Sequence, residues 1–205
     1  MIWSIFIVGA ILIILLQLWY KGLQKPLSKK EIETHLAYFQ QHPQKHTDIE
    51  VFKQFMLKDD GKEICMANFV SLHQGNITHP ITGQEVDAYN AVQDYMKKLL
   101  GIVAKKACHP IYVAYKVGGH VDSWGSDDDI DFRGLQMMRY RSRRDFIELM
   151  LHPNLEQGLA IKFAAIAKTI SYPVQIQFST FLRPNVWLSL IILLICCLLQ
   201  IGLIL

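Results

Sequence analysis

Three histidines in the middle of the chain are the side chains best suited to proton transfer, because an unperturbed imidazole titrates close to neutral pH. They are His73, His79 and His120. We expect His120 at the end of a strand, on the face that also carries Tyr112 and Lys116, so it would line a cavity formed over that face. A haem ligand would also need a carboxylate partner, which the sequence alone does not identify. An ordinary structural role is the favoured interpretation for each histidine.

Two amides fall on apolar strand faces. Asn68 interrupts the predicted strand Glu63–His73, and Gln136 lies between apolar neighbours. A buried amide needs hydrogen-bond partners, so a structural role in the core is favoured over a role in a site. The weak catalytic candidates are therefore His120, Tyr112, Asn68 and His73.

Four arginines lie close together where a predicted strand ends and a helix begins: Arg139, Arg141, Arg143 and Arg144. They predict a contact with lipid headgroups or with an anion at the helix N-terminus. The alternative is that they are solvated or paired with acids such as Glu148, and such surface pairs contribute little energy.

No motif in the sequence predicts a metal or a cofactor. Asp127-Asp-Asp-Ile-Asp131 places four carboxylates within five residues, but the spacing is not that of an EF-hand, and a solvated hairpin tip is the favoured interpretation. The four cysteines have no zinc-type spacing and suit a reducing compartment. There is no phosphate loop, nucleophile elbow or Rossmann glycine set. A net charge of +3 is too small to indicate a nucleic-acid partner.

The two ends of the sequence predict membrane helices. Met1–Tyr20 and Val186–Leu205 contain no charged residue, and each is about 20 residues long, enough to cross a bilayer. The first segment lacks the basic start and the cleavage site of a signal peptide. Basic residues lie only on the inner flanks of the two segments, which predicts a cytoplasmic middle domain. We expect a membrane helix at 1–20, a juxtamembrane helical linker at 21–62, a folded domain at 63–178 and a second membrane helix at 179–205.

Between the membrane helices, hydrophobic periodicity predicts four strands with helices between them. Three capping sequences predict helix starts: Ser28–Glu31, Thr47–Glu50 and Ser142–Asp145. The expected strands are Glu63–His73, Ile111–Val121, Ile130–Tyr140 and Ile170–Phe178, with helices at Glu85–Lys105 and from Ser142, the latter broken at His152-Pro153.

This order, β-α-β-β-α-β, is typical of an α+β ferredoxin-like domain. That topology places the last strand at an edge beside the first, and Pro173 favours an edge position. Both faces of the first strand are apolar, so we expect both to be covered.

Several short segments also resemble a known family. They are Arg139-Tyr-Arg-Ser-Arg-Arg-Asp-Phe146, Leu151-His-Pro153, Lys162-Phe-Ala-Ala165 and Tyr172-Pro173. Together they resemble domain-of-unknown-function family thirteen-thirty, small bacterial proteins of the dimeric α+β-barrel superfamily, over roughly Glu63–Gln177. The resemblance implies that two sheets meet face to face across a twofold axis. It also implies a bacterial protein, which would place the chain in the inner (cell) membrane as a two-pass protein.

Two hypotheses for the function follow. The first is a membrane-anchored protein that self-associates, at least as a dimer, and serves as a scaffold or accessory subunit, with the lipid bilayer and another membrane protein as further partners. The second is a cofactor-free oxygenase or isomerase that acts on a hydrophobic, membrane-derived substrate in the barrel cavity. A fold of this superfamily does not by itself decide between them.

Overall fold

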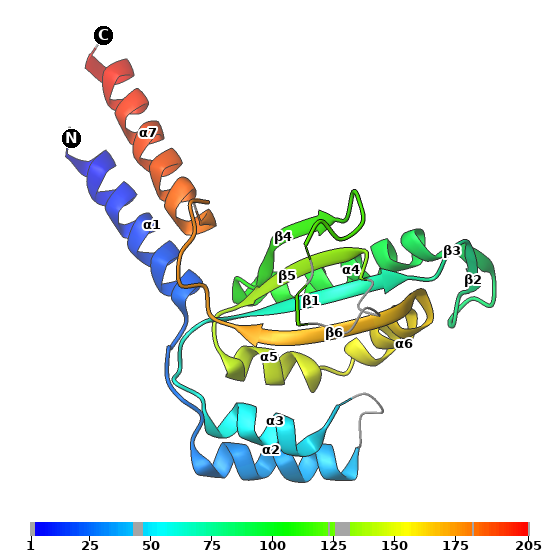
Figure 1. Ribbon diagram of the computed structural model, residues 1–205. Helices are drawn as coiled ribbons and strands as arrows, with labels where there is room; N and C mark the ends of the chain where they lie inside the picture. Colours follow the sequence, from blue (N-terminus) through cyan, green and yellow to red (C-terminus); the bar gives the residue numbers. More distant parts are fainter. Residues whose placement is uncertain (1–2, 43–46, 123, 126–131, 182, 205) are drawn as a thin grey trace.

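The computed structural model describes residues 3–42, 47–122, 124–125, 132–181 and 183–204. Within them the chain forms an α+β fold in which a pair of long helices projects from a four-stranded sheet (Figure 1). The helices are α1 (Ser4–Lys21), α2 (Lys29–Gln41), α3 (Ile49–Leu57), α4 (Ala88–Val103), α5 (Arg143–Met150), α6 (Leu155–Ala165) and α7 (Pro184–Ile204). The strands are β1 (Ile64–Leu72), β2 (Asn76–Thr78), β3 (Glu85–Asp87), β4 (His109–Tyr115), β5 (Gly134–Tyr140) and β6 (Ile166–Val174).

The main sheet is antiparallel and has the order β4-β5-β1-β6. The first and last long strands are neighbours, as the sequence predicted, and β6 is an edge strand. Pro173 lies in that edge strand opposite Met66, where a missing N–H donor costs no ladder bond on the outer side. The predicted α+β class is therefore confirmed as a four-stranded antiparallel sheet combined with helices.

Several strand boundaries differ from the prediction, and the largest shifts are in the second and the last long strand. The strand expected at Ile111–Val121 ends at Tyr115, whose partner Gly134 is the first residue of β5. Gly118 and Gly119 follow and weaken an extended conformation, so His120 lies outside the sheet. The last strand begins at Ile166, directly after α6, and not at Ile170.

The core lies between one face of the sheet and helices α4, α5 and α6. Ile64 and its β5 neighbour Tyr140 pack with Leu99 of α4, Leu149 of α5 and Leu155 of α6. These positions alternate along the strands, so every second residue of β1 and β5 turns to the opposite face.

Helices α2 and α3 form a further layer that packs on α5. The Ser28 hydroxyl and the Glu31 carboxylate complete the predicted capping box at the start of α2. The box predicted at Thr47–Glu50 is wrong by one residue, because the Asp48 side chain accepts the free N–H groups instead. The buried side chains of this layer are Leu27, Ile32, Phe39, Phe52, Met56 and Ile147.

The sequence did not predict the small hairpin β2–β3. Glu85–Asp87 was assigned to a helix, but Asp87 is the N-cap of α4 and accepts the backbone N–H groups of Tyr89 and Asn90. His79 is buried in the connecting turn, where its Nδ1 accepts the backbone N–H groups of Ile81 and Thr82. This histidine therefore has a structural role.

Helices α1 and α7 lie side by side and are long and apolar enough to span a membrane. Gln17 of α1 and Asn185 of α7 hydrogen-bond through their amides, Nδ2 to Oε1, at 2.6 Å. Farther along the pair, Gly9 lets the helices approach, because a Cβ there would lie 2.5 Å from the Cys196 Sγ. Most of the remaining surface of both helices is exposed apolar side chain.

Candidate functional site

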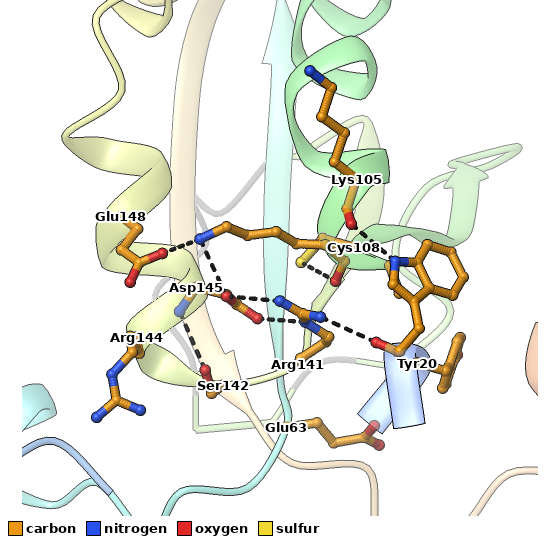
Figure 2. Close-up of polar contacts among 12 residues, drawn as sticks. Tyr20, Glu63, Lys105, Cys108, Arg141, Ser142, Arg144, Asp145 and Glu148 are labelled. Carbon is orange, nitrogen blue, oxygen red and sulfur yellow. Dashed lines mark hydrogen bonds and ion pairs between the residues drawn. The ribbon is translucent and has the colours of Figure 1, made fainter. Parts of the chain in front are cut away.

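The four arginines predicted from sequence gather where the helix pair meets the sheet. β5 ends at Tyr140 and α5 begins at Arg143, with Ser142 as an N-cap that accepts the backbone N–H of Asp145. Figure 2 shows how Arg141 contacts both Asp145 of α5 and a carbonyl near the end of α1. We refer to Arg139, Arg141, Arg143 and Arg144 as the arginine cluster.

Arg139 is the most buried member of the cluster, with only 3% of its surface exposed. Its Nε donates to the Glu63 carboxylate at 3.0 Å, Nη1 to the Ala107 carbonyl at 2.8 Å and Nη2 to the Tyr20 carbonyl at 3.1 Å. The guanidinium also stacks on the Tyr20 ring, 3.9 Å from its centre. Glu63 pairs in addition with Arg183, just before α7. The Glu63 carboxylate thus pairs with Arg139 of the sheet and with Arg183 next to α7. Arg139 in turn contacts Tyr20 near the end of α1.

Arg141 forms a second connection to α1. Its Nε and Nη2 bind the two oxygens of Asp145 at 2.7 and 3.2 Å, and its Nη1 donates to the Trp19 carbonyl at 3.0 Å. The last carbonyls of a helix have no partner within the helix and carry partial negative charge. Arg139 and Arg141 therefore donate hydrogen bonds to carbonyl groups in the last turn of α1, and their positive charge offsets the partial negative charge there.

Acidic residues of α5 complete this corner. Lys106 lies 3.3 Å from Asp145 and also pairs with Glu148, and this pairing raises its pKa although burial opposes the shift. Glu148, which the sequence suggested as an arginine partner, thus binds a lysine. The Trp19 indole N–H donates to the Lys105 carbonyl at 2.9 Å, so α1 also contacts the segment before β4.

Arg144 holds the linker between α1 and α2. It donates to both Glu31 oxygens and to the carbonyls of Lys25 and Pro26. The hydrogen bond from Arg144 lowers the pKa of Glu31 to about 2. Arg143 donates to the Phe55 carbonyl, so all four arginines contact protein groups. The predicted contact with lipid or an anion stays a prediction.

His109 is a member of this corner that the sequence did not single out. Its Nδ1 lies 3.0 Å from the Pro110 carbonyl and its Nε2 lies 3.0 Å from the Tyr20 hydroxyl. Because the carbonyl can only accept, Nδ1 carries the proton and Nε2 accepts from Tyr20. Burial lowers the pKa of His109, which favours this neutral form. The place of His109 in the sequence, beside a proline, gave no signal of such a contact with Tyr20.

The structure does not bring the predicted catalytic residues together. His73 and His120 are exposed outside the main sheet, and Tyr112 is exposed on an edge strand. Asn68 donates to the Met66 and Gln136 carbonyls and accepts the Ser171 hydroxyl. These bonds fit the structural role that was favoured for Asn68. The enzyme hypothesis therefore stays a prediction.

The chemistry of the remaining candidates is limited as well. Burial raises the pKa of the Cys65 thiol to about 11 and also raises that of Cys108, so both are protonated and poor nucleophiles at neutral pH. Among the described residues, no group of three or more His, Cys, Asp or Glu side chains could hold a metal ion. The acidic run Asp127–Asp131 lies outside the described residues.

Comparisons with known proteins identify a shared fold. No family model matches the sequence, so the resemblance to family thirteen-thirty is not confirmed. A search of curated proteins also found no match to the sequence. The solved structures include methylated RPA0582, with 18% identity and a TM-score of 0.55 over 66% of this chain and 96% of that chain. A second structure of RPA0582, a protein of unknown function from Rhodopseudomonas palustris, gives 17% identity and a TM-score of 0.54 over 65% and 96%. At this identity the likeness extends to the fold alone: this chain shares its α+β architecture with RPA0582.

Proposed function

We propose that this chain is a two-pass membrane protein whose α+β domain associates with a second copy through the open face of its sheet. In this role it serves as a scaffold or accessory subunit at the cytoplasmic side of a bacterial inner membrane. The domain would be ferredoxin-like, and the paired sheets would form the dimeric barrel that the sequence resemblance implies. The observation that carries the proposal is the apolar character of the sheet face opposite the helices.

The open sheet face consists of the residues that alternate with the core positions. Its apolar members are Phe69, Tyr112, Leu135, Met137, Ile170 and Tyr172. None of these six belongs to the three hydrophobic clusters formed by described residues. Tyr172 is 54% exposed, and its ring lies edge-on to Phe69 with the ring centres 6.4 Å apart. A contiguous apolar surface of this kind is typical of an interface and is costly in water.

The membrane placement is supported by the surface of the helix pair. Side chains such as Ile7 and Leu15 of α1 and Leu194 and Leu198 of α7 are more than half exposed. Water would be an unfavourable surrounding for so much apolar area, whereas the hydrocarbon core of a bilayer matches it. The arginine cluster then lies at the inner end of the pair, where positive residues are favoured on the cytoplasmic side.

The geometry also supports an anchoring role for the arginine cluster. Arg139 binds the Tyr20 carbonyl, and Glu63 binds both Arg139 and Arg183. These bonds attach the sheet to both long helices at one point. Self-association of the sheets would therefore also bring the helix pairs of two copies together in the membrane.

The test is the mass of the purified protein in detergent, measured by light scattering with the detergent contribution subtracted. We expect at least a dimer for the wild-type chain. Tyr172→Glu should shift the protein to monomer, because two carboxylates would be buried at the interface without partners.

Tyr89→Glu is the matched control, since Tyr89 lies on α4 and is 49% exposed. It should leave the mass unchanged. A strictly monomeric wild-type protein at all concentrations, or equal dimerisation of both variants, would contradict the proposed interface.

A further inference from the structure

Among the contacts of the described residues, the guanidinium of Arg143 makes fewer hydrogen bonds than the other three of the arginine cluster. The other three donate from Nε and from both terminal nitrogens. Arg143 donates only from Nη1, to the Phe55 carbonyl at 2.8 Å. Its Nε is buried and has no hydrogen-bond partner. The nearest carboxylate oxygen, Asp59 Oδ1, is 3.9 Å from Nε, beyond hydrogen-bond distance.

Arg143 also lines a groove on the surface of the domain. This groove, of about 490 Å³, runs between α3 and the end of β6. Five of its ten lining residues are apolar, and the other five supply one guanidinium, one ammonium and three side-chain amides. The lining residues used below are Val51, Phe55, Lys58, Arg143 and Val174. A volume of this size suits a small amphiphilic ligand, since ligand sites in proteins span roughly 300–1,000 Å³.

The charges around the groove indicate the sign and size of the ligand charge. Arg143 and Lys58 favour an anion, and an arginine fork binds a planar carboxylate through two parallel hydrogen bonds. Asp59 is close enough to Arg143 to offset part of this positive charge. A single negative charge therefore fits the groove better than the double charge of a phosphate monoester.

We propose that this groove binds a long-chain carboxylate, with the carboxylate on Arg143 and the hydrocarbon chain along Val51, Phe55 and Val174. Because Nε is buried and cannot be reached from the groove, the ligand carboxylate accepts hydrogen bonds from the terminal nitrogens of Arg143. The hydrocarbon chain covers the apolar part of the wall formed by α3 and β6. This site lies beside α3 at one end of the sheet, and its proposed ligand does not depend on self-association. It gives one member of the arginine cluster a role that the other three, with their donors occupied, do not have.

The experiment uses the full chain in nanodiscs of a neutral lipid at pH 8, with decanoate labelled with ¹³C at the carboxyl carbon. We expect a saturable carboxyl resonance that nanodiscs without protein do not give. Arg143→Gln should weaken decanoate binding roughly tenfold, the usual value of hydrogen bonds to a charged group. Decanol, which has the same chain and no charge, should compete about tenfold less well for the same reason.

Two further variants separate a lost site from a lost fold. Val51→Trp fills the groove from a position that is 66% exposed, so it should abolish binding while the thermal unfolding curve stays unchanged. Lys97→Gln, an exposed lysine on α4, should bind decanoate like the wild type. Equal binding by Val51→Trp, tighter binding of decyl phosphate than of decanoate, or a signal no larger than that of empty nanodiscs would overturn the proposal.

Discussion

Arg139 connects more parts of the molecule than any other described side chain of the arginine cluster. It satisfies a carbonyl at the end of α1, a carbonyl before β4 and the carboxylate of Glu63. A buried ion pair adds little stability compared with an apolar pair of the same shape, but the loss of one partner leaves a charge without compensation. Removing Arg139 should therefore cost more stability than the ion pair itself contributes.

Arg139→Met should lower the free energy of unfolding by about 3 kcal/mol, because it leaves two backbone carbonyls without their donor and leaves Glu63 with Arg183 as its remaining partner. Arg139→Lys should recover only part of this loss, since an ammonium lacks the planar fork that reaches three acceptors. Lys97→Met, at an exposed i,i+3 pair, should change stability by less than about 0.5 kcal/mol. Equal effects of Arg139→Met and Lys97→Met on thermal unfolding would show that the buried pair contributes nothing.

The contact of Glu31 with Arg144 should make the attachment of α2 sensitive to acid. The pKa of Glu31 is lowered from 4.5 to about 2 in the folded chain, so the unfolded chain binds the proton first. The stabilising effect is therefore complete above pH 4.5 and is lost as the pH falls toward 2. Arg144→Met should move the carboxyl titration of Glu31, followed by ¹³C NMR, back toward 4.5. An unchanged titration midpoint in that variant would exclude Arg144 as the cause.

At the scale of elements, the two long helices depend on close contact at a few small or polar positions. Gln17 and Asn185 hydrogen-bond across the pair, and Gly9 faces Cys196. In a membrane, helix association rests on packing and hydrogen bonds, because lipid chains are as apolar as the helix surface. The shape of the contact therefore decides how firmly the pair holds together.

Gly9→Ala should destabilise the helix pair by about 1–2 kcal/mol, because the new methyl group overlaps the Cys196 Sγ and the helices must move apart. The double variant Gly9→Ala, Cys196→Ala should recover most of this loss. Gly202→Ala is the control, since no atom lies within 4 Å of a Cβ added there. Unfolding in mixed detergent micelles measures all three, and a loss for Gly202→Ala as large as for Gly9→Ala would contradict the packing argument.

At the scale of the whole molecule, the chain enters and leaves the sheet on the same side. β1 and β6 are antiparallel neighbours, so the start of β1 and the end of β6 lie together, close to the inner ends of α1 and α7 (Figure 1). Two helices that both cross one bilayer require this arrangement of entry and exit. The topology and the proposed anchoring are therefore geometrically consistent.

A reporter enzyme can test the orientation. Alkaline phosphatase fused after Leu205 should be active, because it would lie outside the cytoplasm, where its disulfides form. A fusion after Gln177, which omits α7, should be inactive for the opposite reason. Activity in the second fusion and none in the first would reverse the orientation deduced from the basic flanks.

The sequence by itself determined the features that depend on neighbours along the chain. Uncharged runs of about 20 residues, strand alternation and most helix starts are local properties, so the long helices, the capping box at Ser28 and the break before Leu155 could be predicted. Even the neighbour relation of β1 and β6 followed, because few topologies join this order of elements. The hairpin β2–β3 could not be predicted, because its strands are too short to show a period.

Only the tertiary structure decided which arginine binds which partner. Arg139 meets Tyr20, more than one hundred residues away, while Arg143 is two positions from Arg141 and has no carboxylate within hydrogen-bond distance. Spacing along the chain predicts a positive cluster, but the acceptors come from α1, α3, the linker and the segment before β4. The groove beside Arg143 likewise exists only because α3 and β6, far apart in sequence, come together in the fold. Local patterns specify elements, whereas unfilled donors and cavities are properties of the packing between them.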